Sequence, residues 1–418
     1  MKIEKIRARE IYDSRGYPTI ACDLLLKDGT VVTSAVPAGT SCGKYEAFEL
    51  RDGGTRLMGK GVLKAIETIN NVIAPVFEGK EPHLVDMDAR MLEMDGTEDR
   101  SKFGANSILA VSMAICRAQA HIEMLELYAF IAQICEFDVV ALPIPMFNMI
   151  NGGLHANNKS SLQEILVVPK DIDNFEQAME FGATVFHILK NILDEHGKST
   201  AVGYEGGFAS AFDNTRQALD YVQEAIARAK QECAGDAVIA IDVAAAHLYD
   251  QGKQRYIIDG KQFSTSELLA WYVELSDAYN IYAIEDGLLE DDWKGWSKMI
   301  DILSQEQLVV GDDFYATNSE RIYKAIEQGI ASGVVIKPNQ IGTITETLQA
   351  VKLCEESGIP VIVSHRSGET NDTFIADLAV GISAQHIKAG GLSRGERMAK
   401  YNRLMTIERD LFSSYDLL

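Results

Sequence analysis

Six short apolar segments in the second half of the chain each end in a charged or polar residue. The segments are AVIAID, IYAIE, LVVGD, GVVIK, PVIVSH and AQHIK, and they end at Asp242, Glu285, Asp312, Lys337, His365 and Lys388. Successive ends are 43, 27, 25, 28 and 23 residues apart, and helical patterns such as 320–329 and 344–357 fill the intervals. Strands that alternate with helices at this spacing indicate a parallel sheet, and so many in series predict a (β/α)8 barrel.

The first third of the chain has an α+β pattern instead. Strand patterns occur at 3–12, 19–26 and 30–36, and the last two flank a hairpin signal at Lys27-Asp28-Gly29. Helical patterns follow at 61–77 and 105–133. A boundary is expected at 136–138, before a strand-like run at 139–146. The predicted fold class is therefore α/β, with a modified (β/α)8 TIM-type barrel at residues 136–418. An N-terminal α+β capping domain at residues 1–135, carrying a mobile lid loop at 37–43, precedes the barrel.

Charge and composition exclude several kinds of partner. The 418 residues include 39 basic and 61 acidic side chains, a net charge of −22, which argues against nucleic acid or an anionic membrane as partner. No apolar run reaches the roughly 20 residues that span a bilayer, and the charged N-terminus is no signal peptide. The six cysteines form no CxxC pair. These features predict a cytoplasmic protein with reduced thiols.

The six strand ends predict one site, because active groups of such barrels lie on the face where the strands end. Asp242, Glu285 and Asp312 offer only oxygen ligands, which suit Mg²⁺. The alternative is that these acids simply face water. Lys337 and Lys388 close apolar strands, where a desolvated lysine near other cations has a lowered pKa and can act as a base. The alternative for them is structural pairing with barrel carboxylates such as Asp313.

Loops supply the other candidate groups. Ser364-His365-Arg366-Ser367-Gly368 combines arginine, hydroxyl and backbone N–H groups that fit a phosphate. Glycine-rich loops at 202–208 and 151–155 carry Glu205 and His155. Either of these two glycine-rich loops, taken alone, is only a weak indication of an active site. The chain has neither a GxGxxG after a strand nor a GxxxxGK[ST], so nothing indicates a nucleotide fold.

Sequence stretches along nearly the whole chain resemble the enolase family. They are IRAREIYDSRGYPT, YEAFELRDGG, GTEDRSKFGANSILAVS, INGGLHANN, QEILVVP, GYEGGF, IEDGLLEDDW, GDDFYATN, IKPNQIGTITET, SHRSGETNDTFIADLAVG and RMAKYNRL. The His-Arg-Ser-Gly-Glu-Thr block and the Lys-Pro-Asn-Gln-Ile-Gly block are the most specific. The resemblance implies a hydro-lyase that converts 2-phosphoglycerate to phosphoenolpyruvate in glycolysis, and the reverse in gluconeogenesis. It also implies a homodimer or an octamer.

The resemblance also implies a role for each candidate residue. Lys337 corresponds to the general base, and Glu205, helped by Glu164, to the acid that protonates the leaving hydroxyl; His155 and His365 lie near the substrate. Substrate binding is implied for Lys388, on the carboxylate, and for Arg366, Ser367, Gln163 and Ser41. Two Mg²⁺ are implied, the first on Asp242, Glu285 and Asp312 and the second arriving with substrate beneath the lid serine, Ser41. A lysine base with Mg²⁺ stabilising an enolate is the known chemistry of this superfamily.

Several positions depart from the family pattern without removing a predicted ligand or catalytic group. They are Tyr17, Cys42, Tyr204, Ala246, His247 and Gly287. Neighbours of a catalytic group can shift it enough to alter rate or substrate choice.

Other functions remain open at this point. One is a family paralogue acting on a related phosphorylated or phosphonylated hydroxy acid. Another is a racemase or dehydratase of the wider superfamily, although Gln163-Glu164-Ile165 stands where those enzymes carry Lys-x-Lys. The third is a non-catalytic role at the cell surface, although the chain ends Ser413-Ser414-Tyr415-Asp416-Leu417-Leu418 without the C-terminal lysines used for it.

Overall fold

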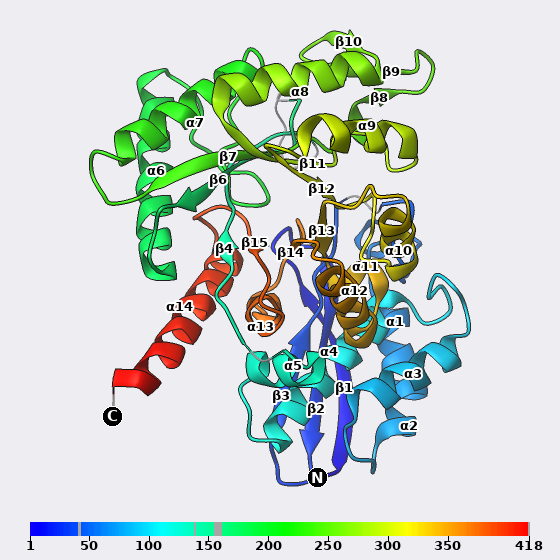
Figure 1. Cartoon of the computed structure of the whole chain (residues 1–418). Helices are drawn as coiled ribbons and strands as arrows, with labels where there is room; N and C mark the ends of the chain where they lie inside the picture. Colours follow the sequence, from blue (N-terminus) through cyan, green and yellow to red (C-terminus); the bar gives the residue numbers. More distant parts are fainter. Residues whose placement is uncertain (41–42, 138, 154–160, 417–418) are drawn as a thin grey trace.

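A nine-stranded sheet forms the centre of the computed structural model, which describes residues 1–40, 43–137, 139–153 and 161–416 (Figure 1). Its strand order is β4-β15-β14-β13-β12-β11-β7-β6-β5. The strands, in chain order, are β4 (Ile144–Pro145), β5 (Phe147–Asn151), β6 (Glu164–Lys170), β7 (Asp236–Asp242), β11 (Ile281–Glu285), β12 (Leu308–Gly311), β13 (Gly333–Ile336), β14 (Val361–Ser364) and β15 (His386–Lys388).

The sheet closes into a barrel at Met146. β4 and β5 stand at the two ends of the strand order, and in the chain only Met146 separates them. Met146 N–H donates to the carbonyl of Ile387 on β15 at 2.9 Å, while β5 pairs with β6 on the other side. Counted as one strand, β4 and β5 give the eight strands expected of this barrel class. The predicted TIM-type barrel is confirmed.

The modification of the barrel lies at β6. This strand is antiparallel to both β5 and β7, whereas the pairs from β7 to β15 and on to β4 are parallel. Two helices, α6 (Phe175–Glu195) and α7 (Thr215–Ala229), follow β6 before β7 begins. Each starts at an asparagine N-cap, Asn174 or Asn214, whose side chain accepts from the N–H three residues on.

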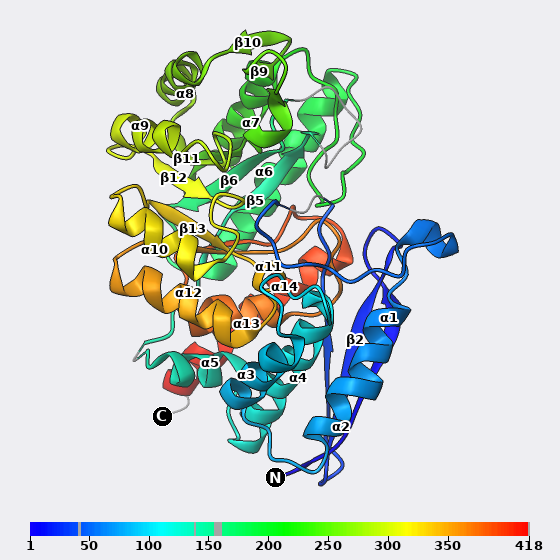
Figure 2. The ribbon, with the colours of Figure 1, turned by 90° about the vertical axis from the view of Figure 1, so that its right-hand side faces the viewer.

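Further helices surround the barrel or cover its ends (Figure 2). They are α8 (Thr265–Tyr279), α9 (Trp293–Leu303), α10 (Ser319–Glu327), α11 (Pro338–Ile341), α12 (Ile344–Glu356), α13 (Phe374–Gly381) and α14 (Gly395–Asp416). Small and branched apolar side chains fill the barrel interior, including Leu166, Ala240, Val310 and Val335. A small sheet of β8 (Tyr249–Asp250), β9 (Arg255–Ile258) and β10 (Lys261–Phe263) precedes α8.

The N-terminal part begins with the antiparallel sheet β1 (Ile3–Tyr12), β2 (Pro18–Leu26) and β3 (Val31–Ala35), as predicted. Its helices are α1 (Leu63–Thr68), α2 (Ala74–Phe77), α3 (Leu84–Asp95), α4 (Ala105–Ile122) and α5 (Leu127–Cys135). The pattern at 105–133 is therefore two helices, bent by 98°, and not one. The expected boundary after residue 135 coincides with the end of α5 but stays a prediction, as does the lid, whose residues 41–42 lie outside the described part.

Loops of the N-terminal part reach the barrel at the ends of its strands. Ala38 N–H donates to the carbonyl of Gly368 at 2.8 Å, and Ala47 N–H to that of Gln340 at 2.7 Å. Ser14 N–H donates to the carbonyl of Glu369 at 2.7 Å. The segments around residues 14, 38 and 47 thus border the loops that follow β13 and β14.

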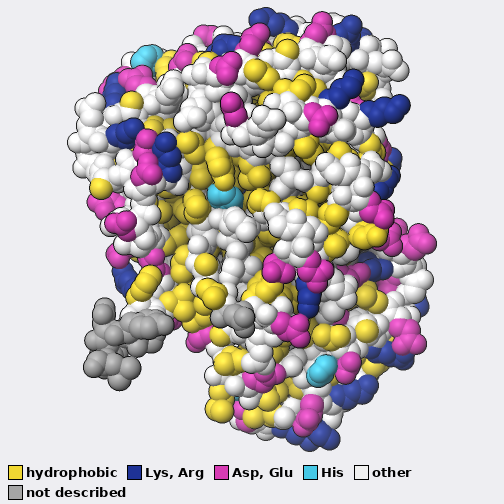
Figure 3. Space-filling model, in the orientation of Figure 1, with side chains coloured by type: hydrophobic (Ala, Val, Ile, Leu, Met, Phe, Trp, Pro, Cys, Tyr) yellow, Lys and Arg dark blue, Asp and Glu magenta, His cyan; other side chains and the backbone are white. Residues whose placement is uncertain are grey.

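Surface features away from the strand ends are of ordinary kinds. On the face shown in Figure 3, apolar side chains gather where residues 139–145 and 169–175 line a groove together with Leu411 and Phe412 of α14. No single helix among the described residues is both long and apolar enough to cross a membrane. The five described cysteines are all free thiols.

Candidate active site

Three buried carboxylates lie side by side where β7, β11 and β12 end. Asp242 and Glu285 are paired residues of the parallel strands β7 and β11, and Asp312 follows the last residue of β12. Their exposed fractions are 4, 3 and 8 %. Burial, and then the neighbouring charge of Asp242, raise the pKa of Glu285 to about 8. Parallel register therefore concentrates negative charge at one point of the barrel face.

The ammonium of Lys388, at the end of β15, lies among these acids. Its Nζ is 2.5 Å from Glu285 Oε2, 2.9 Å from Glu164 Oε2 and 3.4 Å from Asp242 Oδ2. Burial opposes the charge on this lysine, but Glu164 and the other two carboxylates outweigh it and raise its pKa well above the usual range. Lys388 is therefore a permanent cation, suited to hold an anion rather than to accept a proton.

Lys337, the first residue after β13, forms an ion pair with Asp312 Oδ2. Burial is the largest influence and lowers the pKa of this lysine, but the charge of Asp312, together with that of the other nearby carboxylates such as Glu285, outweighs burial and raises the pKa. The expectation of a lowered pKa is thus wrong for the protein alone, because the nearest charge is a carboxylate and not a cation. Asp312 is also bound by Gln340, whose Nε2 donates to Oδ1 at 3.0 Å.

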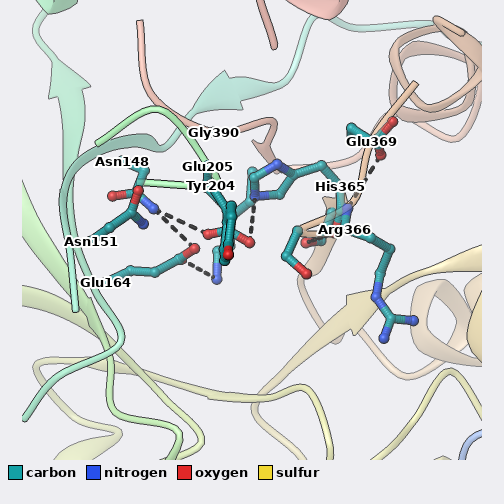
Figure 4. Close-up of polar contacts among 12 residues, drawn as sticks. Asn148, Asn151, Glu164, Tyr204, Glu205, His365, Arg366, Glu369 and Gly390 are labelled. Carbon is teal, nitrogen blue, oxygen red and sulfur yellow. Dashed lines mark hydrogen bonds and ion pairs between the residues drawn. The ribbon is translucent and has the colours of Figure 1, made fainter. Parts of the chain in front are cut away.

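A second cluster joins β6 to the loop at 203–207 (Figure 4). Asn148 Nδ2 donates to Glu164 Oε1 at 3.0 Å and to Glu205 Oε2 at 3.3 Å. His365 Nε2 lies 3.9 Å from Glu205 Oε1. Burial, reinforced by the charge of Glu205, raises the pKa of Glu164 well above its ordinary value. Two carboxyl groups this close favour sharing one proton, so the pair can serve as an acid.

The loop after β14 presents arginine and hydroxyl groups to the same cleft. Arg366 forms a two-pronged ion pair with Glu46, from the N-terminal part, and Nη1 also donates to Asn339 Oδ1 at 2.8 Å. Ser367 Oγ accepts from Thr40 N–H at 2.8 Å. Arg15 lies next to these residues, because its Nη1 donates to Thr40 Oγ1 at 3.0 Å.

The donor set fits a divalent cation. The cleft lining includes seven carboxylic residues against three permanent cations among the described residues. Glu285 Oε1 is buried and takes no hydrogen bond from any described residue, so it has capacity for a ligand. Among the described residues, Asp286, Asp312 and Asp313 have oxygen atoms within 4.8 Å of one another, whereas Asp242 and Glu285 belong to no such group of three. Asp286 accepts the backbone N–H groups of Asp312 and Asp313, each at 2.9 Å, so it orients the loop as well.

The remaining predicted residues are placed as follows. Gln163 Nε2 donates to Asp242 Oδ2 at 3.2 Å, so it borders the metal candidates. His155 and Ser41 lie outside the described residues, and their roles stay predictions. Sequence reasoning missed Glu46, Arg15 and Asn148 as parts of the site. Glu46 and Arg15 stand inside two of the quoted motifs, IRAREIYDSRGYPT and YEAFELRDGG, so the signal for them was present.

The departures from the family pattern occupy different places. Tyr204 is 44 % exposed, beside the buried Glu205. His247 lines the cleft. The glycine at position 287 is explained by its packing. A Cβ there would lie 2.6 Å from Cε of Met299 and 3.2 Å from the ring of Tyr272.

Fold and site together define an α/β-barrel protein in which lysines and buried carboxylates gather in one cleft at the strand ends. The family model described as "Enolase, N-terminal domain" matches residues 3–131, and "Enolase, C-terminal TIM barrel domain" matches residues 139–416. A protein named enolase from a Nitratiruptor species is 45 % identical over 410 residues, which cover 98 % of this chain and 97 % of that protein. The chain therefore belongs to the enolase family, and the predicted class of enzyme, a lyase, is confirmed.

Proposed function

We propose that the protein removes water from 2-phosphoglycerate to give phosphoenolpyruvate, in a Mg²⁺-dependent reaction with Lys337 as base. One observation carries the proposal. Lys337, whose side chain is 13 % exposed, and a buried pair of acids, Glu164 and Glu205, line one cleft that also holds Lys388 and Arg366. A base, an acid and cations for two anionic groups are the parts that this elimination needs.

The base acts first. Lys337 Nζ takes the proton from the carbon next to the substrate carboxylate, and the electron pair moves into that carboxylate. Lys388 is suited to face the carboxylate, because the surrounding carboxylates hold its positive charge against burial, and the charge does not depend on pH near neutrality.

The acid acts second. Glu205 gives a proton to the hydroxyl group on the neighbouring carbon, the carbon–oxygen bond breaks, and water leaves. Glu164 shares Asn148 with Glu205, and its raised pKa favours one proton shared by the pair. Arg366 and Ser367 are the groups suited to hold the phosphate.

Asp242, Glu285 and Asp312 are the residues that would hold the first Mg²⁺. Bound Mg²⁺ would supply positive charge where the substrate carboxylate gains a second negative charge, and would offset the Asp312 charge that raises the pKa of Lys337. A second Mg²⁺ arriving with substrate, with Ser41 as a ligand, belongs to the same proposal.

The wider setting is part of the proposal as well. The reaction would serve glycolysis and, in reverse, gluconeogenesis, in the cytoplasm, by a homodimer or octamer. The free thiols of the five described cysteines motivate the cytoplasmic location.

The test is direct. Purified protein with 2-phosphoglycerate and Mg²⁺ should form phosphoenolpyruvate, followed by its ultraviolet absorbance, and unphosphorylated glycerate should not react. No turnover of 2-phosphoglycerate at any Mg²⁺ concentration would refute the proposed substrate. Turnover of a phosphonate analogue in that case would favour the paralogue.

A further inference from the structure

Arg397, in the first turn of α14, is fully buried beside the acid cluster. Its Nη1 lies 2.6 Å from His365 Nδ1 and donates to the Arg366 carbonyl at 2.7 Å. Its Nη2 donates to the carbonyls of Tyr204, at 2.9 Å, and Ser367, at 2.8 Å. The four hydrogens on the two terminal nitrogens thus meet four acceptors, and each hydrogen has one partner.

This arrangement decides the protonation of His365. A guanidinium group only donates hydrogen bonds, so Nδ1 of the imidazole must accept, and the imidazole proton must be on Nε2. We propose that Arg397 is a positioning residue that holds His365 as the neutral Nε2–H tautomer, so that His365 presents an N–H group toward Glu205. The nitrogen that faces Glu205 Oε1, at 3.9 Å, is Nε2.

Two further features support this role. Burial keeps the pKa of His365 well below its usual range. The positive charges of Arg397, Lys337 and Lys388 lower this pKa further, and together these effects outweigh the negative charge of Glu205, which raises it. An imidazolium is therefore disfavoured. The guanidinium also holds the backbone next to both Glu205 and His365. It binds the carbonyl of Tyr204, which precedes Glu205, and the carbonyls of Arg366 and Ser367, which follow His365.

The stem of Arg397 has little freedom to move. A Cβ on Gly390 would lie 2.7 Å from Arg397 Cδ, and the φ of Gly390 is +97°. Gly391 N–H donates to the carbonyl of Glu205 at 2.7 Å, so the loop that packs on Arg397 also holds the acid. A lysine has one ammonium in place of the planar fork and cannot reach four acceptors in this geometry.

The consequence for catalysis rests on the proposed function. Glu205 becomes a carboxylate when it has given its proton to the leaving hydroxyl, and an Nε2–H group stabilises that charge. His365 keeps its own proton throughout, so the proton count of the reaction is unchanged. The opposite tautomer would place a nitrogen lone pair toward the carboxylate and would repel it.

The first experiment needs no catalysis. Nitrogen-15 NMR of the full-length protein with labelled histidine distinguishes the tautomers, and His365→Gln identifies the His365 signals. We expect an unprotonated Nδ1 and a protonated Nε2 that do not change between about pH 6 and pH 8. In Arg397→Lys the pattern should shift toward the other tautomer or toward a titrating ring. A wild-type His365 protonated on Nδ1, or on both nitrogens, would overturn the proposal.

The second experiment separates positioning from general stability. Arg397→Lys should lower kcat about 10²-fold while α-hydrogen exchange of 2-phosphoglycerate in D₂O stays measurable, since the base is intact. In the double variant, Arg397→Lys should lower kcat by no more than about twofold below that of His365→Gln alone. The reason is that the two substitutions remove the same interaction. Effects that simply multiply would overturn the proposal.

The control is Arg403→Lys on the same helix, whose guanidinium binds Asp377 and Glu126 and not His365. It should leave the His365 signals in place even where it lowers the melting temperature. If the protein turned over no 2-phosphoglycerate at all, the proposed function would fail, but the NMR result would still decide the tautomer.

Discussion

The carboxylate of Glu46 accepts one hydrogen bond from each terminal nitrogen of Arg366, at 3.0 and 3.1 Å. Glu46 comes from the N-terminal part and Arg366 from the loop after β14, and both side chains are 6 % exposed. A bidentate pair in this setting fixes the plane of the guanidinium as well as its charge. The proposed phosphate-binding arginine is therefore oriented from outside the barrel.

Glu46→Gln should destabilise the protein. It should also increase the amount by which 2-phosphoglycerate raises the melting temperature. Removing one partner of a buried ion pair leaves the other charge uncompensated, which costs roughly 3 kcal/mol of unfolding free energy. Addition of 2-phosphoglycerate should raise the melting temperature of the variant more than that of the wild type, because phosphate replaces the lost charge.

The matched control for that variant is Glu49→Gln, which removes an acid of the same loop whose partner is Arg51. Its response to 2-phosphoglycerate should equal that of the wild type. Equal ligand-induced shifts in Glu46→Gln and wild type would show that Arg366 does not meet the phosphate.

Lys337→Ala and Glu205→Gln should fail at different steps. In D₂O the wild type should exchange the α hydrogen of 2-phosphoglycerate, and Lys337→Ala should lose both exchange and dehydration. Glu205→Gln lacks only the acid, so dehydration should fall about 10²–10⁴-fold while exchange stays measurable by NMR. Loss of exchange in Glu205→Gln as complete as in Lys337→Ala would require withdrawal of the two assignments.

Removal of the metal should abolish activity, and Mg²⁺ should restore it. Asp312→Ala should raise the Mg²⁺ concentration needed for half-maximal activity sharply, because it removes one of three oxygen donors. The exposed Asp301 on α9 provides the comparison, and Asp301→Asn should keep the wild-type Mg²⁺ requirement. Full activity of Asp312→Ala at low Mg²⁺ would contradict the ligand assignment.

Asp88 should make stability fall as the pH rises. It is buried on α3, and its Oδ2 accepts from Ser112 Oγ and from N–H and Oγ1 of Thr345, but burial raises its pKa from 3.8 to about 6. The folded chain then holds this proton more tightly than the unfolded chain. The contribution of this proton to the free energy of unfolding is complete below about pH 4 and is lost as the pH rises through about 6. The total loss is at most about 3 kcal/mol.

Asp88→Asn cannot ionise, so its melting temperature relative to the wild type should increase between about pH 4 and pH 7. Glu93→Gln, an exposed position of the same helix, is the control and should show no such trend. A constant difference between Asp88→Asn and wild type over this range would mean that Asp88 does not titrate as described.

The barrel strands and the residues at their ends could be predicted because both signals are local. A parallel strand shows itself as a short apolar run, and its polar end residue comes directly after it, as Lys337 does after β13. The chain order of Asp242, Glu285 and Asp312 therefore translated into neighbouring positions on the barrel face. The motifs also pointed to Arg366 and Ser367, whose loop follows β14 directly.

Relationships between distant residues could not be predicted in this way. The antiparallel direction of β6 depends on the loops around it, and the bend between α4 and α5 depends on packing, while the apolar pattern is the same in either case. The raised pKa of Lys337 follows from the carboxylate nearest to its Nζ, which spacing along the chain does not specify. Glu46 and Arg397 reach the site from parts of the chain that are 320 and 31 residues away from Arg366.

The sequence by itself determined the barrel, its polar strand ends and the family, because these depend on residues that are close together in the chain. Only the tertiary structure decided which charges face one another, which carboxyl groups keep a proton and which nitrogen of His365 carries one. Those properties depend on burial and on distances of a few ångström between side chains, and the packing of the whole chain sets both.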